Sequence, residues 1–344
     1  MPGLLWDVYC RVIDNLGDAG VCWRLAANLV ARGQRVRLVI DDPSPLAFMA
    51  PHGMPDVHVM PWPGPAEAGD VVIEAFGCDP PAQTVAAMAR RERPPVWINL
   101  EYLSAEGYVE RSHGLPSPQL SGPGQGLTKW FFFPGFTPRT GGLLREPGLQ
   151  AQREAFDRQD WLLDQGIARR PDERVVTLFC YENPLIGPLL DDLATEPTLL
   201  LLTPGPAQAQ VLRAPPGVRL HALPWLSQSG FDALLWSSDL SFVRGEDSLV
   251  RAIWAGAPFV WQAYPQHDGA HAAKVEALLD CLHAPAGTAA AWRAWNGLGA
   301  PWPGAHALAP EPFLQLRRTL QAQEDLATQL LGFVQTHPTD APGC

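Results

Sequence analysis

The sequence predicts an α/β protein with two domains, each built on a parallel sheet. Its 344 residues are more than one ordinary core organises and are natural for two domains. In both halves, apolar runs of strand length alternate with amphipathic stretches of helix length, which is typical of βαβ units. A break at residues 166–172 separates the halves, so the boundary is expected between Gln150 and Pro171.

The first half begins with an apolar strand over residues 4–12, a turn over 14–20 and an amphipathic helix over 21–32 that Gly33 ends. A strand over 36–40 completes a βαβ unit, and such a unit implies a parallel sheet. The remaining expected elements are strands at 57–60, 71–75 and 96–100, a partly helical stretch at 80–91 and an irregular loop region at 112–145.

The second half repeats the alternation, from a strand at 175–179 to helices within 310–336. Between them we expect strands at 198–203, 218–223, 240–243 and 259–261, and helices at 189–194, 207–212, 231–236, 248–255 and 271–282.

The composition argues against nucleic acid or an anionic membrane as a main partner. The formal net charge is −11 and only 18% of residues are charged, whereas both partners need clustered Lys and Arg. The aromatic run at residues 129–133 is expected to belong to the core rather than to stack on bases. We expect no signal peptide and no membrane span, since the start lacks a basic region and the apolar runs are short.

The cysteines favour a reducing compartment. There are six of them and no C-x-x-C pair, so neither a disulfide framework nor a zinc site is expected. A cytoplasmic protein is the prediction.

The loop after the first expected strand carries acidic residues at the strand's carboxyl end, where open α/β sheets bind ligands. It contains Asp14, Asn15, Gly17 and Asp18, and it lacks the dinucleotide-binding glycine spacing. Two aspartates would repel a pyrophosphate, and the other ligands of a calcium loop are missing. The loop is therefore expected to address a cation or a proton-bearing acceptor. The structural alternative makes Asp18 the helix N-cap and places Asp14 in an Asx-turn.

A second loop, residues 244–248, joins an expected buried strand to the start of a helix. Backbone N–H groups at a helix start lack intrahelical partners and carry partial positive charge, so together with Arg244 they suit a phosphate. The alternative is an ordinary helix start, with Asp247 or Ser248 as the N-cap and Arg244 paired with Glu246 at the surface.

Three further loops follow expected strands at the same edge of the second sheet. They carry Phe179 and Tyr181, Trp225 and Gln228, and Tyr264 and Gln266. The aromatic rings could stack on a base and Gln228 could read its edge, whereas the alternatives are core aromatics and ordinary loops. Four loops at one edge together predict a pocket for a nucleotide donor.

Several strings spread nearly end to end along the chain resemble the EarP family, the protein-arginine rhamnosyltransferases that modify bacterial elongation factor P. They are Asp7–Leu25, Trp97–Glu106, Phe133–Phe136, Thr140–Glu146, Leu178–Asn183 and Phe242–Ser248. Trp225 stands where the family pattern has Phe, and Ser227 where it has Pro. Trp225 keeps a stacking surface, so the nucleotide site is little affected.

The resemblance implies a GT-B glycosyltransferase fold, with two Rossmann-like domains facing across a cleft. Residues 1–155, completed by a helix within 320–344, would take the acceptor protein, and residues 165–319 would bind the donor. The implied reaction moves L-rhamnose from dTDP-β-L-rhamnose to one arginine of elongation factor P, with inversion, and activates that translation factor. It uses no metal and no cofactor.

The resemblance also assigns residues. The catalytic acids fall on Asp14, Asp18 and Glu246. The family's nucleotide contacts fall on Phe179, Tyr181, Trp225, Gln228, Arg244, Glu246, Asp247, Ser248 and Tyr264. The loop residues Asn15, Gly17 and Gln266 complete the substrate-binding residues that we predict from the sequence.

Physical chemistry makes these assignments coherent. Arg244 and the N–H groups near it can stabilise a diphosphate leaving group. A guanidinium stays protonated in water, so carboxylates must hold it and take its proton as the new bond forms. We expect Asp18 to be the base and Asp14 to orient the acceptor. Glu246 addresses either the sugar or the guanidinium, and the sequence does not decide between them.

Two other functions stay open at this stage. One is a GT-B enzyme with another nucleotide-sugar or acceptor, which calorimetry with dTDP and UDP would separate. The other is a non-catalytic module that binds a nucleotide-sugar and docks on a translation factor. Turnover of the donor would exclude the module, and the carboxylates of the first loop already argue against it.

Overall fold

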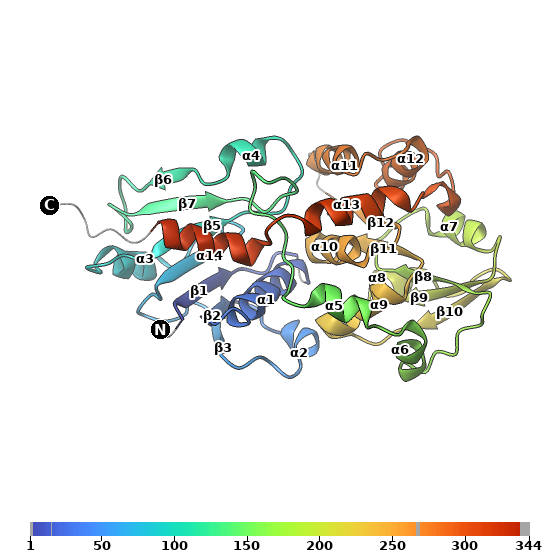
Figure 1. The fold of residues 1–344 in the computed structure, drawn as a ribbon, viewed down its shortest axis with the longest axis horizontal. Coiled ribbons are helices and arrows are strands. Elements are labelled where there is room, and N and C mark those ends of the chain that lie inside the picture. The colour runs from blue at the N-terminus through green and yellow to red at the C-terminus, as the bar shows by residue number, and fades with distance from the viewer. Residues whose placement is uncertain (1–2, 15, 266–268, 338–344) are drawn as a thin grey trace. The chain divides into compact units, whose positions relative to one another are not determined.

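The computed structural model describes residues 3–14, 16–265 and 269–337, and these form two compact units (Figure 1). Unit 1 takes the chain up to Pro147 and again from Ala322, and unit 2 takes the part from Gly148 to Gln321. Unit 2 thus begins two residues before the boundary range expected from the sequence, and the last helix belongs to unit 1.

Within the described residues, unit 1 is built on a seven-stranded sheet of order β3-β2-β1-β4-β5-β7-β6. All neighbouring strands run parallel except β6, which pairs antiparallel with β7. The strands are β1 (Leu5–Cys10), β2 (Arg35–Ile40), β3 (Val57–Pro61), β4 (Val71–Ala75), β5 (Val96–Leu100), β6 (Pro116–Pro118) and β7 (Thr128–Phe132). The strand order reverses between β1 and β4, which is where such sheets bind ligands.

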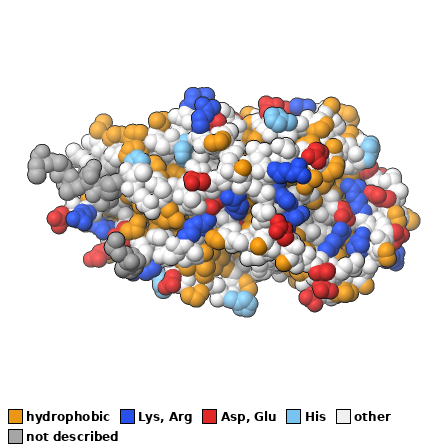
Figure 2. All heavy atoms as spheres, viewed as in Figure 1, with side chains coloured by type: hydrophobic (Ala, Val, Ile, Leu, Met, Phe, Trp, Pro, Cys, Tyr) orange, Lys and Arg blue, Asp and Glu red, His pale blue; other side chains and the backbone are white. Residues whose placement is uncertain are grey.

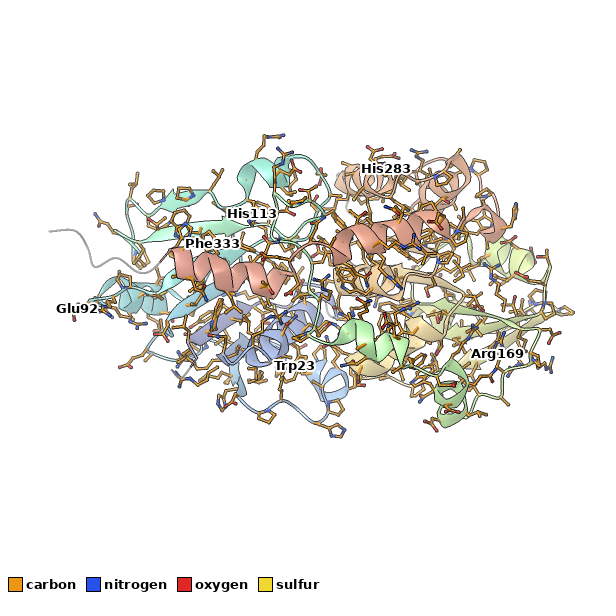
Figure 3. The ribbon with its side chains drawn as sticks, viewed as in Figure 1. Trp23, Glu92, His113, Arg169, His283 and Phe333 are labelled. Atoms are coloured by element: carbon orange, nitrogen blue, oxygen red, sulfur yellow. The ribbon has the colours of Figure 1, made fainter. Side chains whose placement is uncertain are left out.

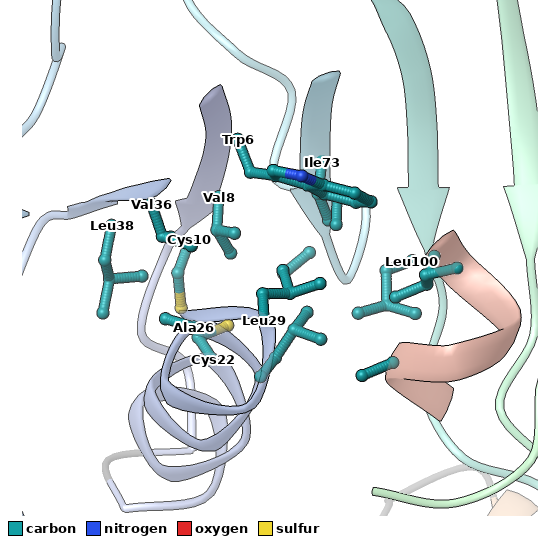
Figure 4. Close-up of a cluster of buried hydrophobic side chains, with 14 of the residues drawn as sticks. Trp6, Val8, Cys10, Cys22, Ala26, Leu29, Val36, Leu38, Ile73 and Leu100 are labelled. Atoms are coloured by element: carbon teal, nitrogen blue, oxygen red, sulfur yellow. The ribbon is translucent and has the colours of Figure 1, made fainter. Parts of the chain in front are cut away.

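The described helices of unit 1 are α1 (Gly17–Val30), α2 (Leu46–Met49), α3 (Ala82–Ala89), α4 (Tyr108–Ser112) and α14 (Leu326–Thr336). The core lies between β1 and α1, where Trp6, Val8 and Cys10 pack toward Cys22 and Leu29 with no exposed surface (Figure 4). Burial of these side chains is the main force that holds α1, and with it the preceding loop, in place.

Helix α14 completes this core from the far end of the chain. Leu326 and Leu330 are buried in the same cluster as β1 and α1. Phe333 lies on α14, and its ring centroid is 5.6 Å from that of Phe132 on β7 (Figure 3). Nη2 of Arg32 donates to both carboxylate oxygens of Asp325 at 2.8 Å, which ties the end of α1 to the start of α14.

The described part of unit 2 is built on a five-stranded parallel sheet of order β10-β9-β8-β11-β12. Its strands are β8 (Arg174–Leu178), β9 (Thr198–Leu202), β10 (Val218–Ala222), β11 (Leu240–Arg244) and β12 (Phe259–Gln262). Its helices are α5 (Leu149–Glu154), α6 (Arg158–Asp164), α7 (Ile186–Leu193), α8 (Pro206–Gln210), α9 (Gln228–Ser237), α10 (Glu246–Ala255), α11 (Ala270–Cys281), α12 (Ala286–Trp295), the short 3-10 helix η1 (Ala305–Ala307) and α13 (Glu311–Gln321). The order reverses between β8 and β11.

Three expectations about the elements are wrong. Helix α1 begins at Gly17 rather than Val21, so half of the expected turn is helical. The segment 112–145 is not wholly irregular, because it contains β6 and β7, and the aromatic run forms β7 beside β5. Helices α2, α4, α5 and α12 and the 3-10 helix η1 were not foreseen. The glycines and prolines around β7 do not resemble a strand in the sequence. Pairing with β5 and β6 stabilises β7 in the sheet.

The charged side chains do not sort by sign on the face that Figure 2 shows, where acidic and basic groups are interspersed. No helix in the described part of the chain is long and apolar enough to cross a membrane. Cys10, Cys22, Cys78, Cys180 and Cys281 are free thiols, and Cys344 lies outside the described residues.

Candidate functional site

The β1–α1 loop, residues 11–16, leads into α1 and brings Asp14 and Asp18 together. Asp18 is only 2% exposed, and its Oδ2 accepts the backbone N–H groups of Ile13 at 2.8 Å and Asp14 at 3.0 Å. In return, the N–H of Asp18 donates to the carbonyl of Asp14 at 3.2 Å. The Asp18 carboxylate therefore folds back onto the loop and holds its shape.

The structure corrects the capping alternative for this loop. Leu16 occupies the N-cap of α1 and Asp18 lies in the first helical turn, so Asp18 is not the cap. An acidic side chain in the first turn still interacts favourably with the positive end of the helix. Asn15, which was predicted as a loop contact, lies outside the described residues.

Burial raises the pKa of Asp18 above its ordinary value of 3.8. The two backbone N–H donors oppose this shift because they stabilise the ionised form, whereas the nearby charges of Asp14 and Asp41 add to it. A carboxylate with a raised pKa is a stronger base than an exposed one. Asp18 thus has the environment of a group that exchanges a proton.

Gly17 allows the carboxylate of Asp14 to lie against the first turn of α1. A Cβ added at Gly17 would stand 2.7 Å from Oδ2 of Asp14, closer than ordinary van der Waals contact. Asp14 is half-buried, between the exposed Ile13 and the buried Asp18. A larger residue at this position would displace the carboxylate of Asp14.

The turn after β11, residues 244–248, places a cation beside a helix start. Gly245 is the N-cap of α10, with φ of 71° and ψ of −170°, a conformation that glycine adopts without strain. Ser248 Oγ accepts the N–H of Arg244 at 3.1 Å and donates to the carbonyl of Arg244. Neither Asp247 nor Ser248 is the N-cap, so that alternative is wrong here as well.

Arg244 lies over two aromatic rings from the neighbouring loop. Its Cζ is 4.7 Å from the ring centroid of Phe179 and 4.3 Å from that of Tyr181. Such contacts orient a guanidinium and contribute to its stability. Its buried Nε has no hydrogen-bond partner among the described residues. The two rings follow β8 and the cation ends β11, so all three lie where the sheet order reverses.

Two exposed aromatic residues lie at the same carboxyl edge of the sheet. Tyr264, 54% exposed, lies edge-on to Tyr181 with centroids 5.6 Å apart. Trp225, 49% exposed, follows β10, and Gln228 is the first residue of α9 after the Ser227 cap. Exposed aromatic rings at a ligand-binding edge are available for stacking.

The other described residues that were predicted in unit 2 fall at the same edge. Glu246 and Asp247 are the first two residues of α10 and are half-buried, and Gln266 lies outside the described residues. Sequence reasoning missed two amides, Gln210 and Gln262, that bond to the backbone around Tyr181. The available signal for Gln262 was a polar residue that ends an apolar strand.

In the described part of the chain, no group of three or more His, Cys, Asp or Glu could hold a metal ion.

The sequence and the fold both match known proteins. Residues 6–335 match the family model described as "Elongation-Factor P (EF-P) rhamnosyltransferase EarP". The chain belongs to the EarP family. A relative from Pseudomonas aeruginosa strain PAO1, named protein-arginine rhamnosyltransferase, is 41% identical over 95% of this chain and 98% of its own. Membership makes this protein a glycosyltransferase of the protein-arginine rhamnosyltransferase class.

Solved structures agree with the EarP assignment. One, described as "Structural basis for EarP-mediated arginine glycosylation of translation elongation factor EF-P", is 32% identical and aligns with a TM-score of 0.69 over 97% of this chain and 99% of that chain. The calicheamicin glycosyltransferase CalG4 aligns with a TM-score of 0.53 at 15% identity, over 97% of this chain and 99% of its own. That likeness concerns the fold alone, and it confirms the predicted GT-B fold class.

Proposed function

We propose that this EarP-family protein transfers L-rhamnose from dTDP-β-L-rhamnose to one arginine side chain of elongation factor P, with inversion at the anomeric carbon. The observation that carries the proposal is a contrast in charge between two strand-to-helix connections. Unit 1 presents carboxylates at Asp14 and Asp18, and unit 2 presents the cation of Arg244 at a glycine-capped helix start. The first suits a cationic acceptor and the second an anionic donor.

The donor side follows from the turn at 244–248. As the bond between the anomeric carbon and the diphosphate oxygen breaks, negative charge grows on the leaving group. Arg244, held on the rings of Phe179 and Tyr181, supplies a fixed positive charge, and the positive end of α10 lies next to it. Trp225 and Tyr264 offer exposed rings for the thymine base, with Gln228 at its edge.

The acceptor side follows from the β1–α1 loop. A guanidinium nitrogen is a poor nucleophile because it is protonated and its lone pair is delocalised. We assign Asp14 to hold the guanidinium and Asp18 to take the proton while the nitrogen bonds to the anomeric carbon. The raised pKa of Asp18 supports this role, since it makes the carboxylate a better proton acceptor.

Glu246 has a third role in the proposal. It is the first residue of α10, and its carboxylate would repel a diphosphate. We therefore assign it to the reacting sugar or to the incoming guanidinium rather than to phosphate binding. Asp247 and Ser248 contribute backbone N–H groups of the first turn, since the hydroxyl of Ser248 is bonded to Arg244.

The comparisons support the choice of acceptor and donor class. The family description names elongation factor P as the acceptor, and the Pseudomonas relative is named for arginine rhamnosylation. We propose that the reaction needs no metal or cofactor, which activity in the presence of EDTA would test. We also propose a cytoplasmic location, where a translation factor is found and where free thiols such as those of Cys78 and Cys281 persist.

Product analysis after incubation of purified protein, elongation factor P and dTDP-β-L-rhamnose tests the proposal. We expect consumption of the donor only when the factor is present, and NMR of the product should show an α-linked rhamnosyl group on an arginine nitrogen. Parallel reactions with UDP-sugars serve as the control for the donor. Turnover with a UDP-sugar would reveal a different donor, and a retained β-linkage would contradict inversion.

A further inference from the structure

Gln262 connects the two loops that carry the donor-side residues. It ends β12, and in the sheet it is paired with Arg244, the last residue of β11. β11 lies between β12 and β8. The side chain of Gln262 is 5% exposed and reaches past β11 to the segment that follows β8.

Its amide bonds to two consecutive backbone positions. Oε1 accepts the N–H of Tyr181 at 2.9 Å, and Nε2 donates to the carbonyl of Glu182 at 3.3 Å. The backbone carbonyl of Gln262 accepts the N–H of Gly245 at 3.3 Å. One residue thus holds both the segment with the aromatic rings and the N-cap of α10.

A second glutamine holds the same segment through the complementary backbone groups. Nε2 of Gln210, the last residue of α8, donates to the carbonyl of Tyr181 at 3.2 Å, and its Oε1 accepts the N–H of Asn183 at 2.8 Å. The two amides together satisfy four backbone groups of residues 181–183. Buried backbone groups need such partners, and a pair of bonds from each amide fixes both position and orientation.

This arrangement determines where the Tyr181 ring stands. The ring is 4.3 Å from Cζ of Arg244 and 5.6 Å from the Tyr264 ring. Arg244 is itself paired with Gln262 in the sheet, so Gln262 contributes to the position of both the ring and the cation. A displacement of the Tyr181 backbone would change the contact that orients the guanidinium.

We propose that Gln262 is a positioning residue for the nucleotide-sugar donor: it sets the Tyr181 ring against the Arg244 guanidinium and links this pair to the Gly245 cap, without itself contacting the reacting atoms. Gln210 supports the same segment from its other side. The inference rests on the proposed donor site in unit 2 and assigns a residue that the donor-site motifs did not include.

The test is steady-state kinetics of Gln262→Met with dTDP-β-L-rhamnose and elongation factor P. Methionine keeps the length of the side chain and removes both amide hydrogen bonds. We expect the KM for the donor and the Kd for dTDP to rise about tenfold, because the released Tyr181 no longer orients the Arg244 guanidinium toward the donor. The KM for elongation factor P and kcat at saturating donor should stay within about twofold of wild type.

Asn296→Leu is the matched control, since Asn296 is an amide that bonds to the residues on either side of Gln262. Its Nδ2 donates to the carbonyl of Trp261 at 2.8 Å, and its Oδ1 accepts the N–H of Ala263 at 2.9 Å. Both variants weaken β12, but only Gln262→Met releases Tyr181. An equal rise in donor KM for the two variants would overturn the inference, as would an unchanged donor KM in Gln262→Met.

A third variant guards against misfolding. If Gln262→Met loses its thermal transition, Gln262→Glu keeps the shape and the acceptor for Tyr181 N–H but cannot donate to Glu182. Its donor KM should still rise, and an unchanged value would reject the inference. The wild-type reaction separates the two proposals: if it uses UDP rather than dTDP, the donor assignment fails and the same variants are compared with UDP.

Discussion

Two strand-to-helix connections have a similar build but opposite charge. They are the β1–α1 loop of unit 1 and the β11–α10 turn of unit 2. Each joins a buried parallel strand to a helix at the point where the strand order reverses. In the first, Asp18 turns its carboxylate back onto the backbone of Ile13 and Asp14. In the second, Ser248 turns its hydroxyl back onto the backbone of Arg244.

The two connections differ in the charged groups that they offer to a ligand. The loop of unit 1 holds a buried acid whose pKa is raised, and it has Gly17 where a larger residue would displace Asp14. The turn of unit 2 holds a cation over aromatic rings, with a glycine at the helix N-cap. We propose on this basis that the β1–α1 loop binds a guanidinium and the β11–α10 turn a diphosphate, and the predictions below test that division.

Substitution of Asp18 should give the largest effect. In Asp18→Asn the amide oxygen can still accept the N–H groups of Ile13 and Asp14, so the loop should keep its shape. We expect kcat for transfer to fall about 10²–10⁴-fold, the contribution typical of a general base. The Kd for dTDP, measured by calorimetry, should stay near the wild-type value.

Asp18→Ala is the control for the structural role, because it removes the acceptor of both N–H groups and should also lower thermal stability. If Asp18 only braces the loop, the asparagine variant will transfer rhamnose normally while the alanine variant fails. That outcome would contradict the assignment of Asp18 as the base.

Substitution of Arg244 should give the next largest effect. Arg244→Met keeps an apolar stem on the rings of Phe179 and Tyr181 and removes the charge. We expect the Kd for dTDP to rise about 10- to 100-fold, the range for hydrogen bonds to a charged group. Arg244→Lys should recover only part of this, since a point charge lacks the planar face that stacks. Unchanged dTDP binding in the methionine variant would contradict the assignment of Arg244 to diphosphate binding.

Gly245→Ala should have a moderate effect on both stability and donor binding. The φ of 71° with ψ of −170° belongs to a region that is strained for residues with a Cβ, at a cost of about 1–3 kcal/mol. We expect a lower free energy of unfolding by chemical denaturation and a higher donor KM. Gly187→Ala is the matched control, because Gly187 lies in α7 with open space around its added Cβ, and there alanine should be neutral or stabilising.

The pH dependence should show the smallest effect. The folded-state pKa of Asp18 lies above 3.8, so the folded protein holds this proton more tightly than the unfolded chain does. The stabilisation from protonated Asp18 is present below 3.8 and is lost as pH rises through the folded-state pKa. Above pH 3.8, unfolding free energies measured for Asp18→Asn should therefore lack this part of the decline in stability. The acid limb of kcat/KM should lie above 3.8 in the wild type.

Much of the fold could be predicted from the sequence because each parallel strand is a short apolar run. Strands at 71–75 and 96–100 were placed at their observed bounds. β6 was missed because its Pro-Ser-Pro sequence is a poor strand former that pairs only at the sheet edge. The start of α1 was placed too late, since Gly17 and Gly20 resemble a turn until burial of Cys22 and Leu25 stabilises the helix.

The site was predictable at the level of loops but not of contacts. Asp18, Phe179, Tyr181 and Arg244 could be predicted as site residues because they lie at or after the ends of expected strands. The carboxyl ends of parallel strands lie at one edge of their sheet. The return of Asp18 onto its own loop and the stacking of Arg244 depend on backbone geometry that no local pattern encodes. The hydrogen bond between Gln262 and Tyr181 joins residues far apart in the chain. It becomes visible only once the order of the strands in the sheet is known.

Mass spectrometry of elongation factor P tests the central claim most directly. The factor is incubated with dTDP-β-L-rhamnose and either the wild-type protein, Asp18→Asn or Arg244→Met, and the modified residue is mapped by peptide sequencing. We predict one rhamnosyl group on one arginine with the wild type, modification slowed at least about 100-fold with Asp18→Asn at any donor concentration, and partial recovery with Arg244→Met when the donor is raised. Modification by Asp18→Asn at the wild-type rate, or no modification by the wild type, would contradict the account.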